Sequence, residues 1–197
     1  MSPASRRRPL IKRLLKWLAN PGLRKQIARS PDRLVLVGEM LPVFARRPGQ
    51  ILWVGVRAYT KGYPAVLEQR GAICWTTDIM PASARWGRAG RHWTGDLLEI
   101  GEVFAPGSFS TVLCNGVFGF GVDTVEMQAK AFEAMAKVLQ PGGVLLLGWN
   151  TDRIPDPLAA QAWRPLFERS GLEGLPERRH IEGTTHVYDL LRRRAAF

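Results

Sequence analysis

The sequence has 197 residues, a length that suits one α/β domain with a substantial core. Hydrophobic residues make up 46% of it, which is ordinary for a globular protein. No apolar run reaches the roughly 18 residues needed to cross a bilayer, which excludes a membrane-spanning helix. We expect no signal peptide, because neither an apolar core nor a small-residue cleavage site follows the basic N-terminus.

The cysteines and histidines predict neither a disulfide framework nor a metal centre. Cys74 and Cys114 lie within apolar runs, which is typical of reduced, buried thiols. His92, His180 and His186 form no metal-ligand spacing with them. We therefore expect a cytoplasmic protein without a bound metal.

The formal net charge of +11 is concentrated near the N-terminus. Residues 1–50 hold twelve of the 28 Lys and Arg residues and two of the 17 acidic residues, so this part carries +10 and the remainder carries +1. The charge thus describes a basic arm, and it does not indicate a nucleic-acid-binding surface over the whole protein.

The first 48 residues predict a helical arm. Apolar residues over 9–20 recur at the spacing of one helix face, with basic residues opposite. A second helix is predicted over residues 30–44, because Ser30 is a good N-cap and Pro31 suits the first turn. Pro42 would end or kink this helix.

From residue 50 onward, short apolar runs alternate with helical patterns. Continuous apolar runs are typical of strands buried on both faces of a parallel sheet. Five such strands are predicted over residues 51–54, 72–77, 91–96, 109–114 and 144–147. Helices are predicted over residues 64–69, 124–139 and 158–170. Two closing strands, over residues 179–182 and 186–191, predict an antiparallel edge. The fold class is therefore α/β, and we predict one domain over residues 49–197.

Small or polar residues follow the first four predicted strands: Gly55, Asp78, Asp96 and the pair Asn115-Gly116. In open parallel sheets, ligands bind beyond the carboxyl ends of the strands. Asp78 lies 23 residues after Gly55, a spacing at which a carboxylate accepts hydrogen bonds from a ribose. These residues predict a nucleoside-binding edge.

This arrangement resembles the class I, Rossmann-like S-adenosylmethionine-dependent methyltransferases over about residues 50–150. The most specific segment is residues 134–143, where a helix ends in leucine and Pro141-Gly142-Gly143 leads into an apolar strand. The other matching segments are residues 51–55, 75–79, 94–97 and 109–115. The resemblance implies a Rossmann-like, seven-stranded, mostly parallel sheet with an antiparallel final strand, S-adenosyl-L-methionine as cofactor, and methyl transfer as activity.

The resemblance also implies a cofactor site at the strand ends. Asp78 would bind the ribose, and Asp96 with Leu97 would hold the adenine. The implied cofactor-binding residues are Gly55, Val56, Arg57, Tyr59, Asp78, Ile79, Asp96, Leu97, Asn115 and Gly116.

The loop after the first strand departs from the family's Gly-x-Gly-x-Gly, because Arg57 and Tyr59 stand at the second and third glycine positions. Two interpretations remain open. In one, Arg57 pairs with the methionine carboxylate of the cofactor and Tyr59 shapes the pocket. In the other, the loop is too crowded, and cofactor binding is weak or lost.

The sequence does not fix a catalytic residue. Methyl transfer is an in-line displacement that positioning and desolvation accelerate without a base. Asp123 and His186 are candidates for a base towards a hydroxyl acceptor. Residues 115–123, with three glycines and two phenylalanines, predict either a loop packed on the core or an aromatic wall of the acceptor pocket.

The expected acceptor is a small or lipid-like molecule. The arm would be a docked helix with a solvated face, a lid, a peripheral membrane contact through residues 9–20, or a nucleic-acid contact. The loss of two glycines from the loop after the first strand favours an alternative, a non-catalytic methyltransferase-like binding or assembly protein. An RNA methyltransferase is disfavoured, because we find no RNA-binding module. The oligomeric state stays open.

Overall fold

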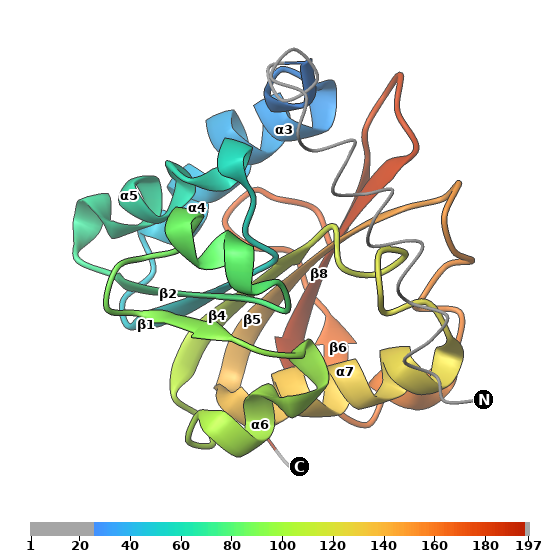
Figure 1. The fold of residues 1–197 in the computed structure, drawn as a ribbon. Helices are drawn as coiled ribbons and strands as arrows, with labels where there is room; N and C mark the ends of the chain where they lie inside the picture. Colours follow the sequence, from blue (N-terminus) through green and yellow to red (C-terminus); the bar gives the residue numbers. More distant parts are fainter. Residues whose placement is uncertain (1–25, 196–197) are drawn as a thin grey trace.

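An eight-stranded sheet forms the centre of the computed structural model, which describes residues 26–195 (Figure 1). The strand order is β3-β2-β1-β4-β5-β8-β6, with β7 paired to β8. Strands β1 to β5 run parallel, and β8 is antiparallel to β5, β6 and β7. The strands are β1 Gln50–Val54, β2 Ile73–Asp78, β3 His92–Thr94, β4 Phe109–Asn115, β5 Leu139–Asn150, β6 Phe167–Arg169, β7 Arg178–His180 and β8 His186–Arg193. The mostly parallel sheet with an antiparallel closing strand is confirmed, with one strand more than predicted.

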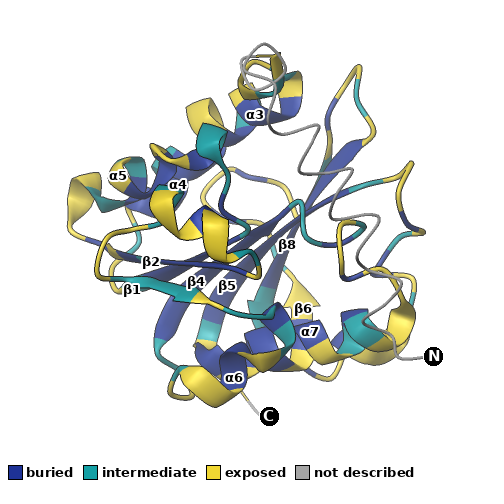
Figure 2. Cartoon of the chain, in the orientation of Figure 1, coloured by how far each residue is buried: buried dark blue, intermediate teal, exposed yellow. Residues whose placement is uncertain are grey.

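Helices cover both faces of the sheet, and the strands between them are buried (Figure 2). On one side, α6 (Ile100–Val103) and α7 (Val125–Val138) share a core with Leu52 and Val54 of β1. On the other side, α3 to α5 share a core with Ile51 and Trp53. Successive β1 residues thus point to opposite faces, which explains why the strand is apolar throughout.

The helix predicted over residues 30–44 is present with an irregular turn. It consists of α3 (Pro31–Val35), the π-helical η1 (Leu36–Met40) and α4 (Leu41–Ala45). Pro42 lacks an N–H and its ring crowds the preceding turn, and the wider π turn upstream accommodates it without ending the helix. Four of its apolar residues are at most 1% exposed: Leu36, Met40, Leu41 and Phe44.

This part of the predicted arm therefore packs into the core. The helix predicted over residues 9–20 lies outside the described residues, and the division of the chain at residue 48 stays a prediction.

The helices predicted over residues 64–69 and 124–139 are confirmed. The first is α5 (Tyr63–Leu67) with the 3-10 turn η3 (Glu68–Arg70), and it ends at Gly71, whose φ of +90° favours glycine. The second is α7, where the Thr124 hydroxyl accepts a hydrogen bond from the Met127 N–H at 3.3 Å. Further 3-10 turns are η2 (Ala58–Thr60), η4 (Pro81–Trp86) and η5 (Leu97–Glu99).

The helix predicted over residues 158–170 is wrong. This stretch contains only the 3-10 turn η6 (Gln161–Trp163), followed by β6. Pro165 accounts for the difference, because a proline in the middle of a helix removes a hydrogen bond and clashes with the preceding turn. The apolar residues that produced the helical pattern are buried nevertheless: Leu158, Trp163, Leu166 and Phe167.

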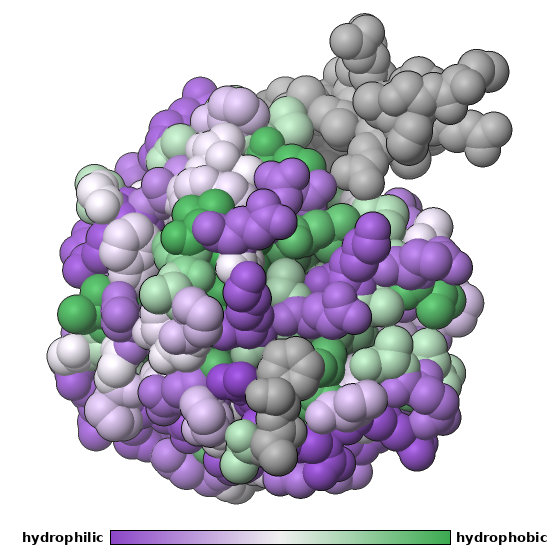
Figure 3. Space-filling view, turned by 90° about the horizontal axis from the view of Figure 1, so that it is seen from below, coloured by the Kyte–Doolittle hydropathy of each residue, from purple (hydrophilic) through white to green (hydrophobic). Residues whose placement is uncertain are grey.

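The exposed large hydrophobic side chains come from several separate elements: Leu34, Val37, Ile73, Ile79, Val103, Phe120 and Val125. On the face seen in Figure 3, hydrophilic residues predominate and hydrophobic ones lie between them. Within residues 26–195, no helix combines the length and apolarity that crossing a bilayer requires. Cys74 and Cys114 are both buried and unpaired, as predicted.

Candidate functional site

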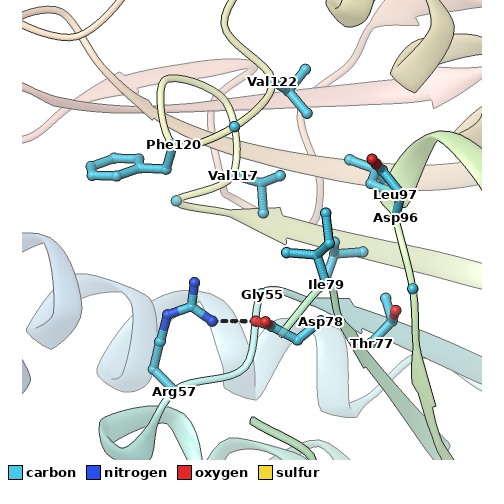
Figure 4. Close-up of a pocket in the computed structure, with 14 residues that line it drawn as sticks. Gly55, Arg57, Thr77, Asp78, Ile79, Asp96, Leu97, Val117, Phe120 and Val122 are labelled. Carbon is cyan, nitrogen blue, oxygen red and sulfur yellow. Dashed lines mark hydrogen bonds and ion pairs between the residues drawn. The ribbon is translucent and has the colours of Figure 1, made fainter. Parts of the chain in front are cut away.

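The carboxyl ends of the first four strands enclose a pocket (Figure 4). Parallel pairing aligns these ends, because Val54 of β1 lies opposite Thr77 of β2 and Cys114 of β4. The lining residues are Val54, Gly55, Arg57, Thr77, Asp78, Ile79, Gly95, Asp96, Leu97, Gly116, Val117, Phe120, Gly121 and Val122. Seven of the ten predicted cofactor-binding residues are in this lining.

Gly55 makes the turn that leaves β1. Its φ is +89°, and a Cβ there would lie 3.1 Å from Val117 Cγ2 and 3.2 Å from the Asn115 carbonyl oxygen. Any other residue would be strained in this conformation and would crowd the loop after β4. The turn therefore brings the backbone close to the end of β4 at the base of the pocket.

Asp78 ends β2 and is a buried carboxylate with several donors. Its Oδ2 accepts the Val56 N–H at 2.9 Å, and its Oδ1 accepts the Met80 N–H at 2.8 Å. The Arg57 guanidinium also pairs with Oδ2 (Figure 4). Two backbone hydrogen bonds and one opposite charge offset the cost of burying this carboxylate.

Arg57 thus contacts the carboxylate that the sequence assigned to a ribose. Its Nη1 also donates to its own neighbour, the Val56 carbonyl, at 2.6 Å. Its backbone N–H donates to Thr60 Oγ1 at 2.9 Å, which fixes the loop. The interpretation that Arg57 is directed at a methionine carboxylate does not describe this conformation, because the guanidinium lies on Asp78.

Asp96 and Leu97 follow β3 on the far side of the pocket. Asp96 Oδ1 accepts the Leu98 N–H at 3.1 Å, so the carboxylate caps the turn η5. Leu97 is buried, and Ile79 is 48% exposed. Thr77 also lines the pocket, and within residues 26–195 its Oγ1 is buried without a hydrogen-bond partner. The β2–β3 side therefore combines apolar walls with oxygen acceptors.

The loop after β4 supplies pocket residues that the sequence did not assign: Val117, Phe120, Gly121 and Val122. Phe118 is fully buried and packs on Phe132, with ring centroids 5.4 Å apart. Phe120 lines the pocket (Figure 4). Phe118 thus packs on the core, as one interpretation of this loop predicted, and the other interpretation, an aromatic wall of the acceptor pocket, stays a prediction.

Three predicted cofactor residues do not line the pocket. Val56 is buried and contributes its backbone N–H to Asp78. Tyr59 lies under the Arg33 guanidinium, whose central carbon is 5.3 Å from the ring centroid. Asn115 is buried and donates from Nδ2 to the Tyr188 hydroxyl at 3.4 Å.

Asn115 belongs to a second group of polar side chains beyond Gly116, at the ends of β4 and β5 and the start of β8. We call this group the polar cluster; it comprises Asp32, Arg33, Asn115, Asn150, His186 and Tyr188. The Tyr188 hydroxyl donates to the Asp32 carbonyl at 3.1 Å, which links β8 to α3. All members except Asn150 are buried.

His186, a candidate base, lies in this cluster and outside the pocket lining. Its Nδ1 is 3.1 Å from Asn150 Oδ1, and its ring packs edge-on against Tyr188. Burial lowers the pKa of His186 to about 4; the positive charge of Arg33 acts in the same direction and Asp32 opposes it. The imidazole is therefore neutral near pH 7.

Asp123, the other candidate base, is exposed and does not line the pocket. Its Oδ1 accepts the Gly121 N–H at 2.9 Å, so the carboxylate stabilises the turn of the glycine-rich loop. The structure thus gives Asp123 a local structural contact.

The sequence matches a family model described as a methyltransferase domain over residues 59–147. The comparison with curated proteins gives no match.

The fold is similar to several solved structures. The N-methyltransferase NodS from Bradyrhizobium japonicum WM9, in complex with S-adenosyl-L-homocysteine, has a TM-score of 0.68 at 16% identity, with 93% of this chain and 98% of that chain covered. A TehB-like SAM-dependent methyltransferase from Corynebacterium glutamicum has a TM-score of 0.59 at 20% identity, with 89% and 100% covered. TrmN from Thermus thermophilus has a TM-score of 0.62 at 17% identity, with 84% of this chain and 50% of that chain covered.

Proposed function

We propose that the chain is a class I, Rossmann-like S-adenosylmethionine-dependent methyltransferase, and that it methylates a small or lipid-like acceptor with S-adenosyl-L-methionine bound at the carboxyl edge of the sheet. The observation that carries the proposal is the placement of Asp78 and Asp96 on one pocket, directly beyond Gly55. Two of the structures with a similar fold are methyltransferases, which supports this proposal, and one of them contains S-adenosyl-L-homocysteine.

The residues of the pocket fit the nucleoside part of this cofactor. Asp78 provides carboxylate oxygens for the ribose hydroxyls, and Leu97 with Val122 provides an apolar wall for the base. Thr77 Oγ1, buried and unpartnered among the described residues, is available to a polar group of the ligand. When bound, the cofactor supplies the methyl group from a sulfonium.

The chain's own residues position the reactants and exclude water. The Gly55 turn brings the backbone to the base of the pocket, and Phe120 contributes an aromatic side chain to its lining. Positioning and desolvation of this kind account for much of the acceleration of a methyl transfer.

The charge of the pocket supports a small acceptor over a nucleic acid. Its lining contains one basic residue, Arg57, and two acidic residues, Asp78 and Asp96. A nucleic-acid site would present basic side chains around its rim to contact phosphates.

Isothermal titration of the full chain with S-adenosyl-L-homocysteine tests cofactor binding. We expect saturable one-to-one binding, with NAD as a ligand that does not bind; no heat at millimolar S-adenosyl-L-homocysteine would contradict the proposal. Incubation with methyl-labelled cofactor and a cell extract then tests the acceptor. We expect the label in the fraction of small molecules and lipids, and label in the RNA fraction would exclude the proposed acceptor class.

One observation favours a second candidate function. The Arg57–Asp78 pair engages the ribose-binding carboxylate, as expected of a methyltransferase-like protein that binds or assembles without catalysis. Titration separates the two functions, because the non-catalytic protein would bind S-adenosyl-L-homocysteine only weakly or not at all.

A further inference from the structure

Arg33 carries a buried guanidinium at the boundary between the pocket and the polar cluster. It lies on α3, and its side chain is only 9% exposed. The sequence counts it among twelve basic residues of the first fifty, but the structure places it inside the molecule.

Arg33 has a charge partner, but its hydrogen-bonding capacity is not fully used. Its Nε lies 3.3 Å from Asp32 Oδ2, and its guanidinium stacks over the Tyr59 ring. Among residues 26–195, Nε is buried without a hydrogen-bond partner. A buried guanidinium with unmade hydrogen bonds is costly, so an anionic ligand that satisfies it would bind with a corresponding gain.

The guanidinium lies next to Gly116 of the pocket lining, although Arg33 itself is not part of that lining. Its Nη2 lies 3.8 Å from the point where a Cβ on Gly116 would sit, and Gly116 lines the pocket at the end of β4. Tyr59, beneath the guanidinium, belongs to the loop after β1. Arg33 therefore lies between the loop after β1 and the end of β4.

The strand order relates the position of Arg33 to the two pocket carboxylates. Along the sheet edge, Asp96 follows β3, Asp78 follows β2, and Arg33 comes next, beside the ends of β1 and β4. A cofactor with its adenine at β3 and its ribose at β2 presents its amino-acid end to β1 and β4, where Arg33 is the buried cation. Arg57, which the sequence favoured for this role, is already paired with Asp78.

We propose that Arg33 binds the amino-acid carboxylate of the cofactor, which makes α3 part of the cofactor site. This inference rests on the proposed function. A planar guanidinium presents two parallel N–H donors to a carboxylate, and charge-assisted hydrogen bonds of this kind are among the strongest in proteins. The missing side chain at Gly116 leaves the approach to Nη2 open.

Two ligands that differ only in the carboxylate test the contact between Arg33 and this group. S-adenosyl-L-homocysteine carries the carboxylate, and its decarboxylated analogue keeps the ammonium group and lacks only the carboxylate. We expect titration of the full chain to show tighter binding of the first ligand, by roughly 10- to 100-fold. In Arg33→Gln this preference should fall to within about 3-fold, because affinity for the decarboxylated analogue should change little, whereas Arg33→Lys should keep part of the preference.

Arg46→Gln is the matched control. It removes one positive charge from the same helical segment, at an exposed side chain that pairs with Glu173, and it should leave the preference intact. A preference unchanged in Arg33→Gln, or an equal loss of both ligands, would overturn the assignment while the proposed function stands. If the wild-type chain binds neither ligand, the proposed function and this inference both fail.

Discussion

The two halves of the carboxyl edge of the sheet are built in different ways. In the pocket, backbone donors two residues away hold one oxygen of each carboxylate, Met80 for Asp78 and Leu98 for Asp96, and the residues just after β1 reach the other oxygen of Asp78. In the polar cluster, contacts join distant parts of the chain, since Tyr188 bonds to Asp32 across 156 positions. The pocket half follows from rules local to each strand end, whereas the cluster half exists only once α3 and β8 have packed on the sheet.

The largest expected effect is a loss of ligand affinity when Asp78 in the pocket is replaced. Asp78→Ala should weaken binding of S-adenosyl-L-homocysteine by about 100-fold or more, because it removes a charged acceptor for two ribose hydroxyls. Asp96→Ala should cost less, roughly 10-fold, because a single adenine contact is lost. Isothermal titration of both variants measures the difference. Equal affinities of Asp78→Ala and the wild type would refute the ribose assignment.

The folding of Asp78→Ala must be checked separately, because Asp78 also accepts the N–H groups of Val56 and Met80. Asp78→Asn keeps the shape and one acceptor oxygen, and it should show an intermediate loss of affinity. Near-ultraviolet circular dichroism of the ligand-free variants controls for the native packing.

For the polar cluster, we expect an effect of pH on the free energy of unfolding. The pKa of His186 is lowered to about 4, mainly by burial, against an ordinary value of 6.5. Between these values the unfolded chain binds a proton that the folded chain does not, so His186 makes stability fall as the pH falls from about 6.5 to about 4. The expected loss is about 3 kcal/mol at the acid end.

Urea unfolding at several pH values tests this expectation. In His186→Asn, the decline between pH 7 and pH 4 should be smaller than in the wild type by about 2 to 3 kcal/mol. The charged and titratable groups near the ring, Arg33 and Asp32 on α3 and Tyr188 on β8, remain in the variant. His180→Asn is the control, because His180 is exposed, and its profile should follow the wild type. Parallel profiles for all three proteins would show that His186 is not titrating in this way.

The sequence predicted the position of seven pocket residues, because they lie at or just after strand ends, while their role in cofactor binding stays a prediction. Gly55 and Asp78 stand at strand ends that the apolar runs define, so their positions follow once the sheet is recognised. The partner of Arg57 was harder to predict, because Asp78 lies 21 positions away and the geometry of the loop decides which carboxylate the guanidinium reaches. Arg33 was missed, since no pattern separates it from the other basic residues of the arm.

Two of the predicted helices contain a proline, and its effect was not predicted correctly or completely. A helix was predicted over residues 158–170 because apolar residues recur there, but periodicity does not register the geometric effect of Pro165. Pro42, which was expected to end or kink its helix, does not end it, and a π turn precedes it. In both places, the outcome depends on which turn forms beside the proline, and periodicity does not predict that turn.

Gly148 gives a smaller test of how tightly the polar cluster is packed. It lies in β5, where an added Cβ would collide with the Asn115 side chain and come within 3.0 Å of His186 Nε2. Gly148→Ala should therefore lower the free energy of unfolding by about 2 kcal/mol, as overpacking of a core does. Gly38→Ala is the control, because nothing lies within 4 Å of its added Cβ, and it should stabilise the helix by about 0.5 kcal/mol. Two variants of equal stability would mean that the cluster is loosely packed.

The smallest expected effect is the change in ligand affinity in Arg57→Ala. Whether binding becomes stronger or weaker distinguishes two roles of Arg57. Asp78 Oδ2 already accepts both the Val56 N–H and the Arg57 guanidinium, so a ribose hydroxyl must displace Arg57 to use this oxygen. Arg57→Ala should therefore strengthen binding of S-adenosyl-L-homocysteine by roughly 3- to 10-fold, because one competing charged hydrogen bond is removed. If Arg57 instead bound the cofactor's carboxylate, the same variant would bind more weakly, and the preference over the decarboxylated analogue would disappear with it. Titration of this variant with both ligands thus decides whether the arginine in the glycine position opposes the cofactor or holds it.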